Sequence, residues 1–166
     1  MTGLFWNCRG VSKKGMSVMI KELLADNMVD FVGLQETIKK KYSNAFFRKI
    51  DPPKKYMWHW IPSDGKSGGI LCGVNLEKFD VTNFSVGTFS LSVNVMCKKE
   101  KKKLLLVSVY GPSHDENKED FLTEVSQLCA RRDCPMIMGG DFNILRYSSK
   151  KIKHSLLIST QISLTR

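Results

Sequence analysis

The stretch of the sequence with the clearest chemical potential runs from Pro135 to Asn143. An apolar run, Met136 to Met138, is followed by two glycines and then by Asp141 and Asn143. A buried strand that ends at Gly-Gly can turn sharply and present the next side chains at its carboxyl end, where open sheets carry their chemistry. On extended backbone, a carboxylate and an amide two positions apart point to the same side, so both could reach one phosphate, water or metal-bound ligand. Gly-Gly-Asp is also typical of an ordinary hairpin or loop entry.

Three further polar residues, Asn7, Glu36 and Tyr110, each follow a predicted strand. Four such strand ends that alternate with helices or hairpins predict that the polar residues meet in one cleft. Each residue also has a simpler interpretation. Glu36 could be an ordinary strand-end carboxylate, Asn7 could cap the turn into the first helix, and Tyr110 could be a packed ring with a solvated hydroxyl.

The first segments that would position these residues form a βαβ unit. An apolar strand at Leu4–Trp6 precedes an amphipathic helix at Met16–Leu24, and the apolar run Val29–Leu34 predicts a strand covered on both faces. The spacing of Phe46 and Phe47 predicts a short helix at Ser43–Ile50, stopped by the two prolines that follow.

The rest of the predicted α/β fold is rich in strands. Alternating apolar residues, separated by turn residues, predict five strands: Tyr56–Ile61, Gly69–Val74, Phe79–Val86, Phe89–Cys97 and Leu104–Tyr110. Within the first of these, Trp58, His59 and Trp60 could stack on nucleic-acid bases, but a half-buried strand is the preferred interpretation. A capping-box pattern at Ser113–Glu116 predicts the start of a further helix, and Pro135–Gly139 predicts the last strand.

Composition places the chain among globular proteins. Its 166 residues suffice for one domain, and 42% of them are hydrophobic while 25% are charged. No apolar run approaches the roughly 20 residues of a membrane span, and no signal peptide is evident, so we expect a nuclear or cytoplasmic protein without membrane contact. The five cysteines show no C-x-x-C pair and no ligand-like spacing to the histidines, which predicts reduced core residues rather than a zinc site.

The formal net charge of +10 is concentrated in two stretches, Lys98–Lys103 and Arg146–Arg166. The first stretch lies between two predicted strands, so we interpret it as a solvated hairpin tip that keeps a sheet edge from pairing. A surface that attracts phosphates is the alternative.

Five motifs occur in the order and rough spacing of the endonuclease/exonuclease/phosphatase superfamily, which includes DNase-I-like nucleases. They are Trp6-Asn7-Cys8-Arg9-Gly10, Leu34-Gln35-Glu36-Thr37, Ser67-Gly68-Gly69-Ile70, Val109-Tyr110-Gly111-Pro112 and Gly139-Gly140-Asp141-Phe142-Asn143. The amino-acid sequences of these motifs most resemble those of the endonuclease domain of LINE-type non-LTR retrotransposons, particularly those of plants. The resemblance implies a DNase-I-like sandwich of two mixed β-sheets flanked by helices in residues 1–147, with 148–166 as a basic, poorly defined tail.

The resemblance also implies a role for each polar residue in hydrolysis of DNA phosphodiesters. Glu36 would hold Mg²⁺, with Mn²⁺ as an alternative metal, and Asp141 would orient or deprotonate the attacking water. Asn7 and Asn143 would position the phosphate and neighbouring carboxylates, while Tyr110 would donate its hydroxyl to a phosphate oxygen. Arg9 resembles a surface or ion-pairing residue and is not assigned to the site.

Members of the superfamily continue beyond this motif set to a histidine-bearing ending that contacts the scissile phosphate. His154, the only histidine after Asn143, does not lie in such a motif, so we expect a C-terminally truncated fold with weak or absent nuclease activity. No reverse-transcriptase segment is evident. Two alternatives remain open: a relative that acts on phosphoinositides or sphingomyelin, and a non-catalytic remnant that binds nucleic acid through its lysines.

Overall fold

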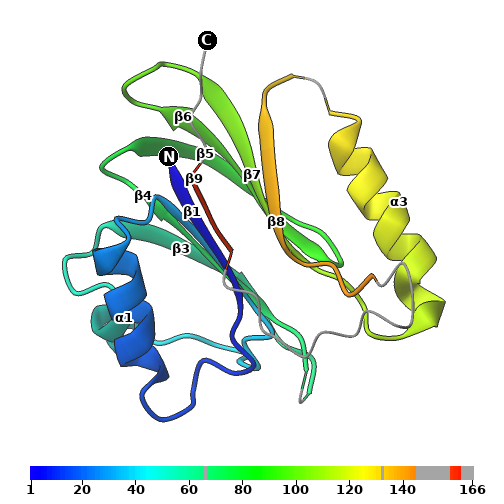
Figure 1. Ribbon diagram of the computed structural model, residues 1–166, viewed down its shortest axis with the longest axis horizontal. Coiled ribbons are helices and arrows are strands. Elements are labelled where there is room, and N and C mark those ends of the chain that lie inside the picture. The colour runs from blue at the N-terminus through cyan, green and yellow to red at the C-terminus, as the bar shows by residue number, and fades with distance from the viewer. Residues whose placement is uncertain (66, 132, 145–157, 162–166) are drawn as a thin grey trace.

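Two mixed β-sheets pack face to face, and helices cover their outer sides (Figure 1). The computed structural model describes residues 1–65, 67–131, 133–144 and 158–161. The predicted fold class is confirmed: the arrangement is an α/β sandwich of the DNase-I-like type.

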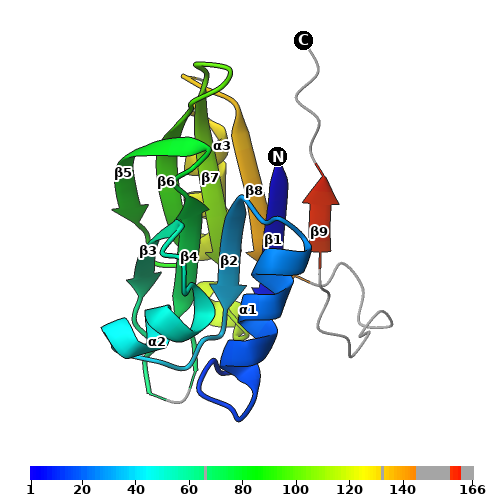
Figure 2. The same cartoon turned by 90° about the vertical axis from the view of Figure 1, so that its left-hand side faces the viewer.

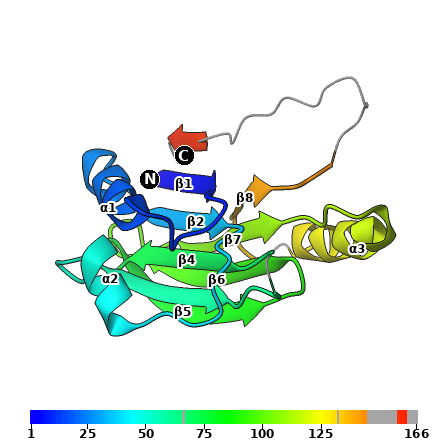
Figure 3. The same cartoon turned by 90° about the horizontal axis from the view of Figure 1, so that it is seen from below.

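The first sheet has the order β3-β4-β2-β1-β9. Its strands β1 and β2 are parallel neighbours and are joined by helix α1, as the βαβ pattern predicts. The strand β9 pairs antiparallel with β1 at the edge of this sheet (Figure 3) and falls within the tail predicted at 148–166. The elements of this half are β1 (Thr2–Asn7), α1 (Met16–Asp26), β2 (Phe31–Gln35), α2 (Asn44–Ile50), β3 (Tyr56–Ile61), β4 (Ile70–Asn75) and β9 (Ile158–Gln161).

The second sheet has the order β5-β6-β7-β8. Its first three strands form an antiparallel meander, and the lysine run lies at the exposed tip between β6 and β7, as interpreted from the sequence. The last two strands are parallel and are connected through a 3-10 turn and helix α3. The elements are β5 (Phe79–Val86), β6 (Ser90–Cys97), β7 (Lys103–Tyr110), η1 (Asp115–Asn117), α3 (Lys118–Cys129) and β8 (Met136–Asp141).

The apolar side chains form three clusters that separate four layers of structure. Residues of α1 and α2, such as Ile20 and Ile50, pack against the outer face of the first sheet. Phe5 and Phe31 belong to the cluster between the sheets, and Phe121 of α3 packs on the outer face of the second sheet. Burial of apolar surface on both faces of each sheet therefore fixes the sandwich.

Two expectations from the sequence, the capping box at the last helix and the burial of all cysteines, are wrong. The pattern at Ser113–Glu116 does not form a capping box, because the chain first makes the 3-10 turn η1 and α3 begins at Lys118 without a side-chain cap. An ion pair between Asp115 and Lys118 bridges that turn instead. Of the cysteines expected in the core, Cys8 and Cys72 are buried, whereas Cys129 at the end of α3 is exposed.

The strand β8 is also longer than predicted, since it continues through Gly139 and Gly140 to Asp141. A side chain at Gly139 would collide with the ring of Phe5 on the facing sheet. Gly140 has a φ of 138° and lies against the backbone of Val109, where a Cβ atom could not be accommodated. The two glycines thus allow close approach within a strand and are not a turn.

Both parallel pairs, β1 with β2 and β7 with β8, run in the same direction through the sandwich (Figure 2). Their carboxyl ends consequently lie at one edge of the molecule, and the residues that follow them face a common region.

Candidate active site

A hydrogen bond between the side chains of Asn7 and Asp141 joins the two sheets at this edge. The Asn7 amide nitrogen Nδ2 donates to Asp141 Oδ2 over 2.6 Å, although the residues are 134 positions apart in the sequence. Asn7 ends β1 in one sheet and Asp141 ends β8 in the other. The Oδ1 atom of Asn7 also accepts from the Arg9 backbone N–H at 3.3 Å, so Asn7 both orients the carboxylate and caps the following turn.

Asn143 lies beside Asp141 but not in the geometry predicted from the sequence. Its φ of 50° is left-handed rather than extended. Its backbone N–H donates to Asp141 Oδ1 at 3.1 Å, and its side-chain amide donates to the Gly111 carbonyl at 2.7 Å. Both oxygens of Asp141 are therefore hydrogen-bonded, and Asn143 fixes the loop after β8 to the loop after β7.

Glu36 follows β2 in a left-handed conformation with a φ of 52°. Its backbone carbonyl accepts from the Gly10 N–H at 2.8 Å, which ties the segments after β1 and β2 together. Its half-buried carboxylate accepts no hydrogen bond from the residues that the structure describes. Glu36 thus presents unoccupied oxygen ligands at the edge where Asp141 lies.

Tyr110 ends β7 directly opposite Asp141 in the strand register. Burial raises the pKa of its hydroxyl to about 12, and the negative charges of Glu36 and then Asp141 act in the same direction. Both carboxylates therefore lie close enough to Tyr110 to affect its ionisation, and the hydroxyl stays protonated as a hydrogen-bond donor near neutral pH. The four strand ends picked out in the sequence do come together.

Arg9 is a residue that the sequence interpretation excluded. It is exposed, but its positive charge lowers the pKa of Tyr110 against the larger effects of burial and the carboxylates. The guanidinium accordingly lies within electrostatic range of the cluster. Arg9 directly follows the Asn7-Cys8 pair, and its backbone has a left-handed φ of 48°.

Beneath Glu36, the preceding residue Gln35 is completely buried between the sheets. Its side-chain nitrogen Nε2 donates to the Ser108 hydroxyl at 2.7 Å and to the Gly33 carbonyl at 2.9 Å. Ser108 belongs to β7, so this bond links the strand that precedes Glu36 to the strand that ends at Tyr110. The two hydrogen bonds of the Gln35 side chain therefore help to fix the position of Glu36 relative to Tyr110.

The donor set fits a Mg²⁺ ion in the way this ion usually binds proteins. Mg²⁺ takes oxygen ligands, keeps several waters and needs one or two carboxylates plus a substrate phosphate. The unpaired Glu36 carboxylate at the rim satisfies this requirement. Among the described residues, no group of three or more acidic, histidine or cysteine side chains that could hold a metal ion is found.

The histidines do not complete the cluster in the part of the chain that is described. His59 stacks on Phe84 with ring centroids 4.6 Å apart, in keeping with a half-buried strand at β3. His114 lies exposed in the loop between β7 and α3. His154, the only histidine after Asn143, lies outside the described residues.

The two facing mixed sheets, with the polar cluster at their shared carboxyl edge, form an α/β sandwich of the DNase-I-like type. The chain belongs to the Endonuclease/Exonuclease/phosphatase family, which its sequence matches over residues 4–150. A search among curated proteins finds no match.

Solved structures share this fold at low sequence identity. A D. rerio TDP2 complexed with single-strand DNA product superimposes with a TM-score of 0.68 and 17% identity over 87% of this chain and 61% of that one. The human Nocturnin catalytic domain with bound sulfate gives 0.63 and 14%, over 87% and 65% of the two chains. A mannosyl-6-phosphatase of Bacteroides thetaiotaomicron gives 0.66 and 13%, over 90% and 68%. The chain thus spans roughly three fifths to two thirds of these proteins.

No helix in the described ranges is long and apolar enough to cross a membrane.

Proposed function

We propose that this chain hydrolyses phosphodiester bonds of DNA with the help of Mg²⁺ or Mn²⁺. The observation that carries the proposal is the Asn7–Asp141 hydrogen bond, which holds a carboxylate beside Glu36 and Tyr110. The hydrogen-bonded carboxylate of Asp141 can activate water, and the unpaired carboxylate of Glu36 can bind a metal ion. The protonated hydroxyl of Tyr110 can stabilise charge on the phosphate.

In this mechanism Asp141 accepts a proton from the attacking water, while Asn7 and the Asn143 backbone N–H keep its carboxylate in place. Tyr110 donates its hydroxyl to a non-bridging phosphate oxygen as negative charge develops there. Glu36 would hold the metal ion, which would supply positive charge that stabilises the phosphate and the leaving oxygen. The side-chain amide of Asn143 contributes indirectly, because it is bonded to Gly111 and positions the loop.

The choice of DNA rests on the resemblance of the motifs to retrotransposon endonucleases and on the basic charge of the chain. A TDP2 that was solved with a single-strand DNA product shares the fold. The fold itself is compatible with other phosphate esters, as the mannosyl-6-phosphatase illustrates. The weak or absent nuclease activity expected from the sequence stays a prediction.

Nicking of supercoiled plasmid tests the proposal. Enzyme in excess over plasmid, with Mg²⁺ or Mn²⁺ and with EDTA as the blank, detects even slow turnover. We expect metal-dependent nicking that Asp141→Ala and Glu36→Gln each reduce by a factor of about 10² or more. The matched control is Asp26→Ala, an exposed carboxylate at the end of α1, which should nick like the unaltered protein.

Two results would overturn the proposal. Salt-sensitive DNA binding without metal-dependent turnover would identify a non-catalytic nucleic-acid binder. Release of phosphate from phosphoinositide or of phosphocholine from sphingomyelin vesicles, without any nicking, would identify a lipid phosphoesterase.

A further inference from the structure

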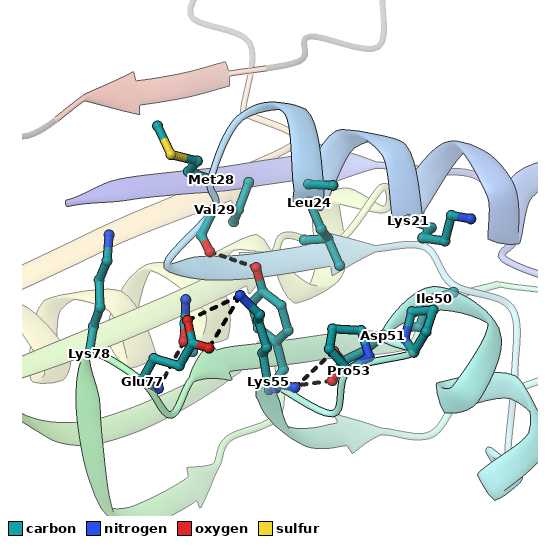
Figure 4. Close-up of a pocket in the computed structure, with 14 residues that line it drawn as sticks. Lys21, Leu24, Met28, Val29, Ile50, Asp51, Pro53, Lys55, Glu77 and Lys78 are labelled. Carbon is teal, nitrogen blue, oxygen red and sulfur yellow. Dashed lines mark hydrogen bonds and ion pairs between the residues drawn. The ribbon is translucent and has the colours of Figure 1, made fainter.

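A cavity of about 380 Å³ lies at the end of the first sheet opposite to the candidate active site (Figure 4). Helix α1 forms one side of it with Lys21 and Leu24, and the segment after α2 forms another with Pro53. The cavity reaches Val29, just before β2, whereas Glu36 follows the other end of that strand. Its volume lies within the range of small-molecule sites, and the proposed hydrolysis gives it no role.

Much of the lining is apolar. Leu24, Val29 and Ile50 are buried members of the core cluster between the helices and the first sheet, and they form part of the cavity wall. Met28 also lines the cavity, is 76% exposed and has a left-handed φ of 45°, which residues other than glycine rarely adopt. An apolar ligand in the cavity could therefore bury surface against both the core and this exposed side chain.

Two hydrogen-bond donors of the lining have no partner in the described part of the chain. Asn75 is only 7% exposed, and its side-chain oxygen accepts from the Glu77 backbone N–H at 2.9 Å. The side-chain nitrogen of Asn75 donates to none of the described residues, and the ammonium of Lys21 forms no ion pair or hydrogen bond with them. Because a nearly buried donor without a partner is costly, these groups favour a ligand that brings oxygen acceptors.

The other charged side chains of the lining already have partners. Lys55 pairs with Glu77 at 3.2 Å, and Lys78 pairs with the buried carboxylate of Asp30 at 2.6 Å (Figure 4 shows the first of these pairs). The carboxylate of Asp51 accepts from two backbone N–H groups and from an indole N–H of β3. These hydrogen bonds direct the Asp51 carboxylate toward β3.

We propose that this cavity binds a small monocarboxylic acid with an apolar body. The apolar body lies against Leu24, Val29 and Ile50, and the carboxylate faces the ammonium of the one lysine in the lining that has no anionic partner among the described residues. A single uncompensated lysine, Lys21, matches one negative charge, whereas a group with several phosphates would need several free cations. The Asn75 amide supplies a further donor for an oxygen of the ligand.

This inference goes beyond the proposed hydrolysis and does not depend on it. The ligand would contact α1, the segment after α2 and the residues before β2, all remote from Asp141. A ligand that binds only the folded chain also stabilises the fold. Binding can therefore be measured without turnover.

Titration of the whole chain with octanoate, followed in ¹⁵N–¹H spectra, tests the proposal. We expect saturable shifts of the amides of Leu24, Met28 and Lys55, while the amides of Tyr110 and Asp141 stay in place. Decanoate should bind more tightly by about tenfold, because each buried methylene contributes about fourfold. Octylammonium, which has an eight-carbon chain and the opposite charge, should bind at least about threefold more weakly than octanoate.

The variant Ala25→Trp places a large ring in the cavity from an exposed position of α1 and should remove octanoate binding. The matched control Ala45→Trp alters an exposed alanine of α2 outside the cavity and should bind octanoate like the unaltered protein. Lys21→Gln should weaken octanoate binding by about two- to fivefold without weakening octylammonium binding. Lys49→Gln, at an exposed position of α2 outside the cavity, should change neither.

Three results would overturn the proposal: no saturable shifts with octanoate, equal affinity for octanoate and octylammonium, or octanoate binding that survives Ala25→Trp. If the tryptophan variant does not fold, the effect of Lys21→Gln decides, and an unchanged affinity for octanoate in that variant would equally overturn the proposal. Saturable octanoate binding in a chain that nicks no plasmid would support the cavity as a carboxylate site while the proposed hydrolysis fails.

Discussion

The amide of Gln35 and the hydroxyl of Ser108 form a 2.7 Å hydrogen bond across the buried space between the two sheets. Both residues are completely buried, and each lies one or two positions before a residue of the candidate site, Glu36 or Tyr110. This hydrogen bond therefore helps to fix the position of one sheet relative to the other close to the candidate site.

Removal of this link should destabilise the fold. Ser108→Ala leaves one Gln35 N–H without its partner in the core, and we expect the free energy of unfolding to fall by about 1 to 3 kcal/mol. Urea denaturation measures the change. Ser126→Ala, at an exposed position of α3, is the matched control and should change stability by less than about 0.5 kcal/mol. Equal stability of the two variants would show that the hydrogen bond has no net effect.

The contact between Gly139 and Phe5 leads to a second prediction. Gly139→Ala would place its Cβ atom 2.6 Å from the Phe5 ring, so the facing sheets must shift and stability should fall by about 1 to 3 kcal/mol. In Gly3→Ala the new Cβ would lie 3.4 Å from the same ring, and the cost should be smaller. Thermal unfolding of both variants checks the order, and a Gly3→Ala protein that is less stable than Gly139→Ala would contradict it.

Exchange of the Asn7 amide for a carboxylate should change the pH dependence of turnover. Asn7→Asp places a second negative charge 2.6 Å from Asp141 in the present geometry, and like charges at that distance raise the pKa of the pair. Because Asp141 must be ionised to accept a proton, the acidic limb of the kcat profile should move to higher pH. Asn44→Asp, remote from the site, serves as control, and an unmoved acidic limb would argue against Asp141 as the base.

The raised pKa of Tyr110 predicts how stability changes at alkaline pH. Burial sets this pKa at about 12, against 10.0 for an ordinary tyrosine. The folded state thus favours the neutral phenol, and this contribution is fully present below about pH 10 and lost as the pH rises to about 12. Tyr110→Phe cannot ionise, so its melting temperature should fall less steeply between about pH 9.5 and about pH 11.5. Parallel curves for the two proteins would refute the prediction.

Sequence patterns predicted the strands and helices well where burial alone decides them. The run Val29–Leu34 became the fully buried β2, and the spacing of apolar residues from Met16 gave α1. Ser43 caps α2 through the hydrogen bond its side chain accepts from the Phe46 N–H. Local signals suffice in these places because the spacing of apolar residues alone indicates which side chains are buried.

The errors fall where distant contacts override local preference. Gly139 and Gly140 resemble a turn, yet the need to fit Phe5 and Val109 keeps them in β8. Asn143 was expected on extended backbone, but its bonds to Asp141 and Gly111 hold it in a left-handed conformation. No pattern within β8 could reveal Phe5, Val109 or Gly111, since these residues come from other parts of the chain.

The Asn7–Asp141 hydrogen bond spans nearly the whole of the family match, because it pairs the end of the first strand with the end of the eighth. During synthesis on a ribosome, Asp141 is therefore added only after almost the entire sandwich has been made, long after Asn7. A nascent chain that stops short of Asp141 holds Glu36 and Tyr110 but has no group to take the proton. The proposed proton transfer therefore requires both halves of the sandwich to be present.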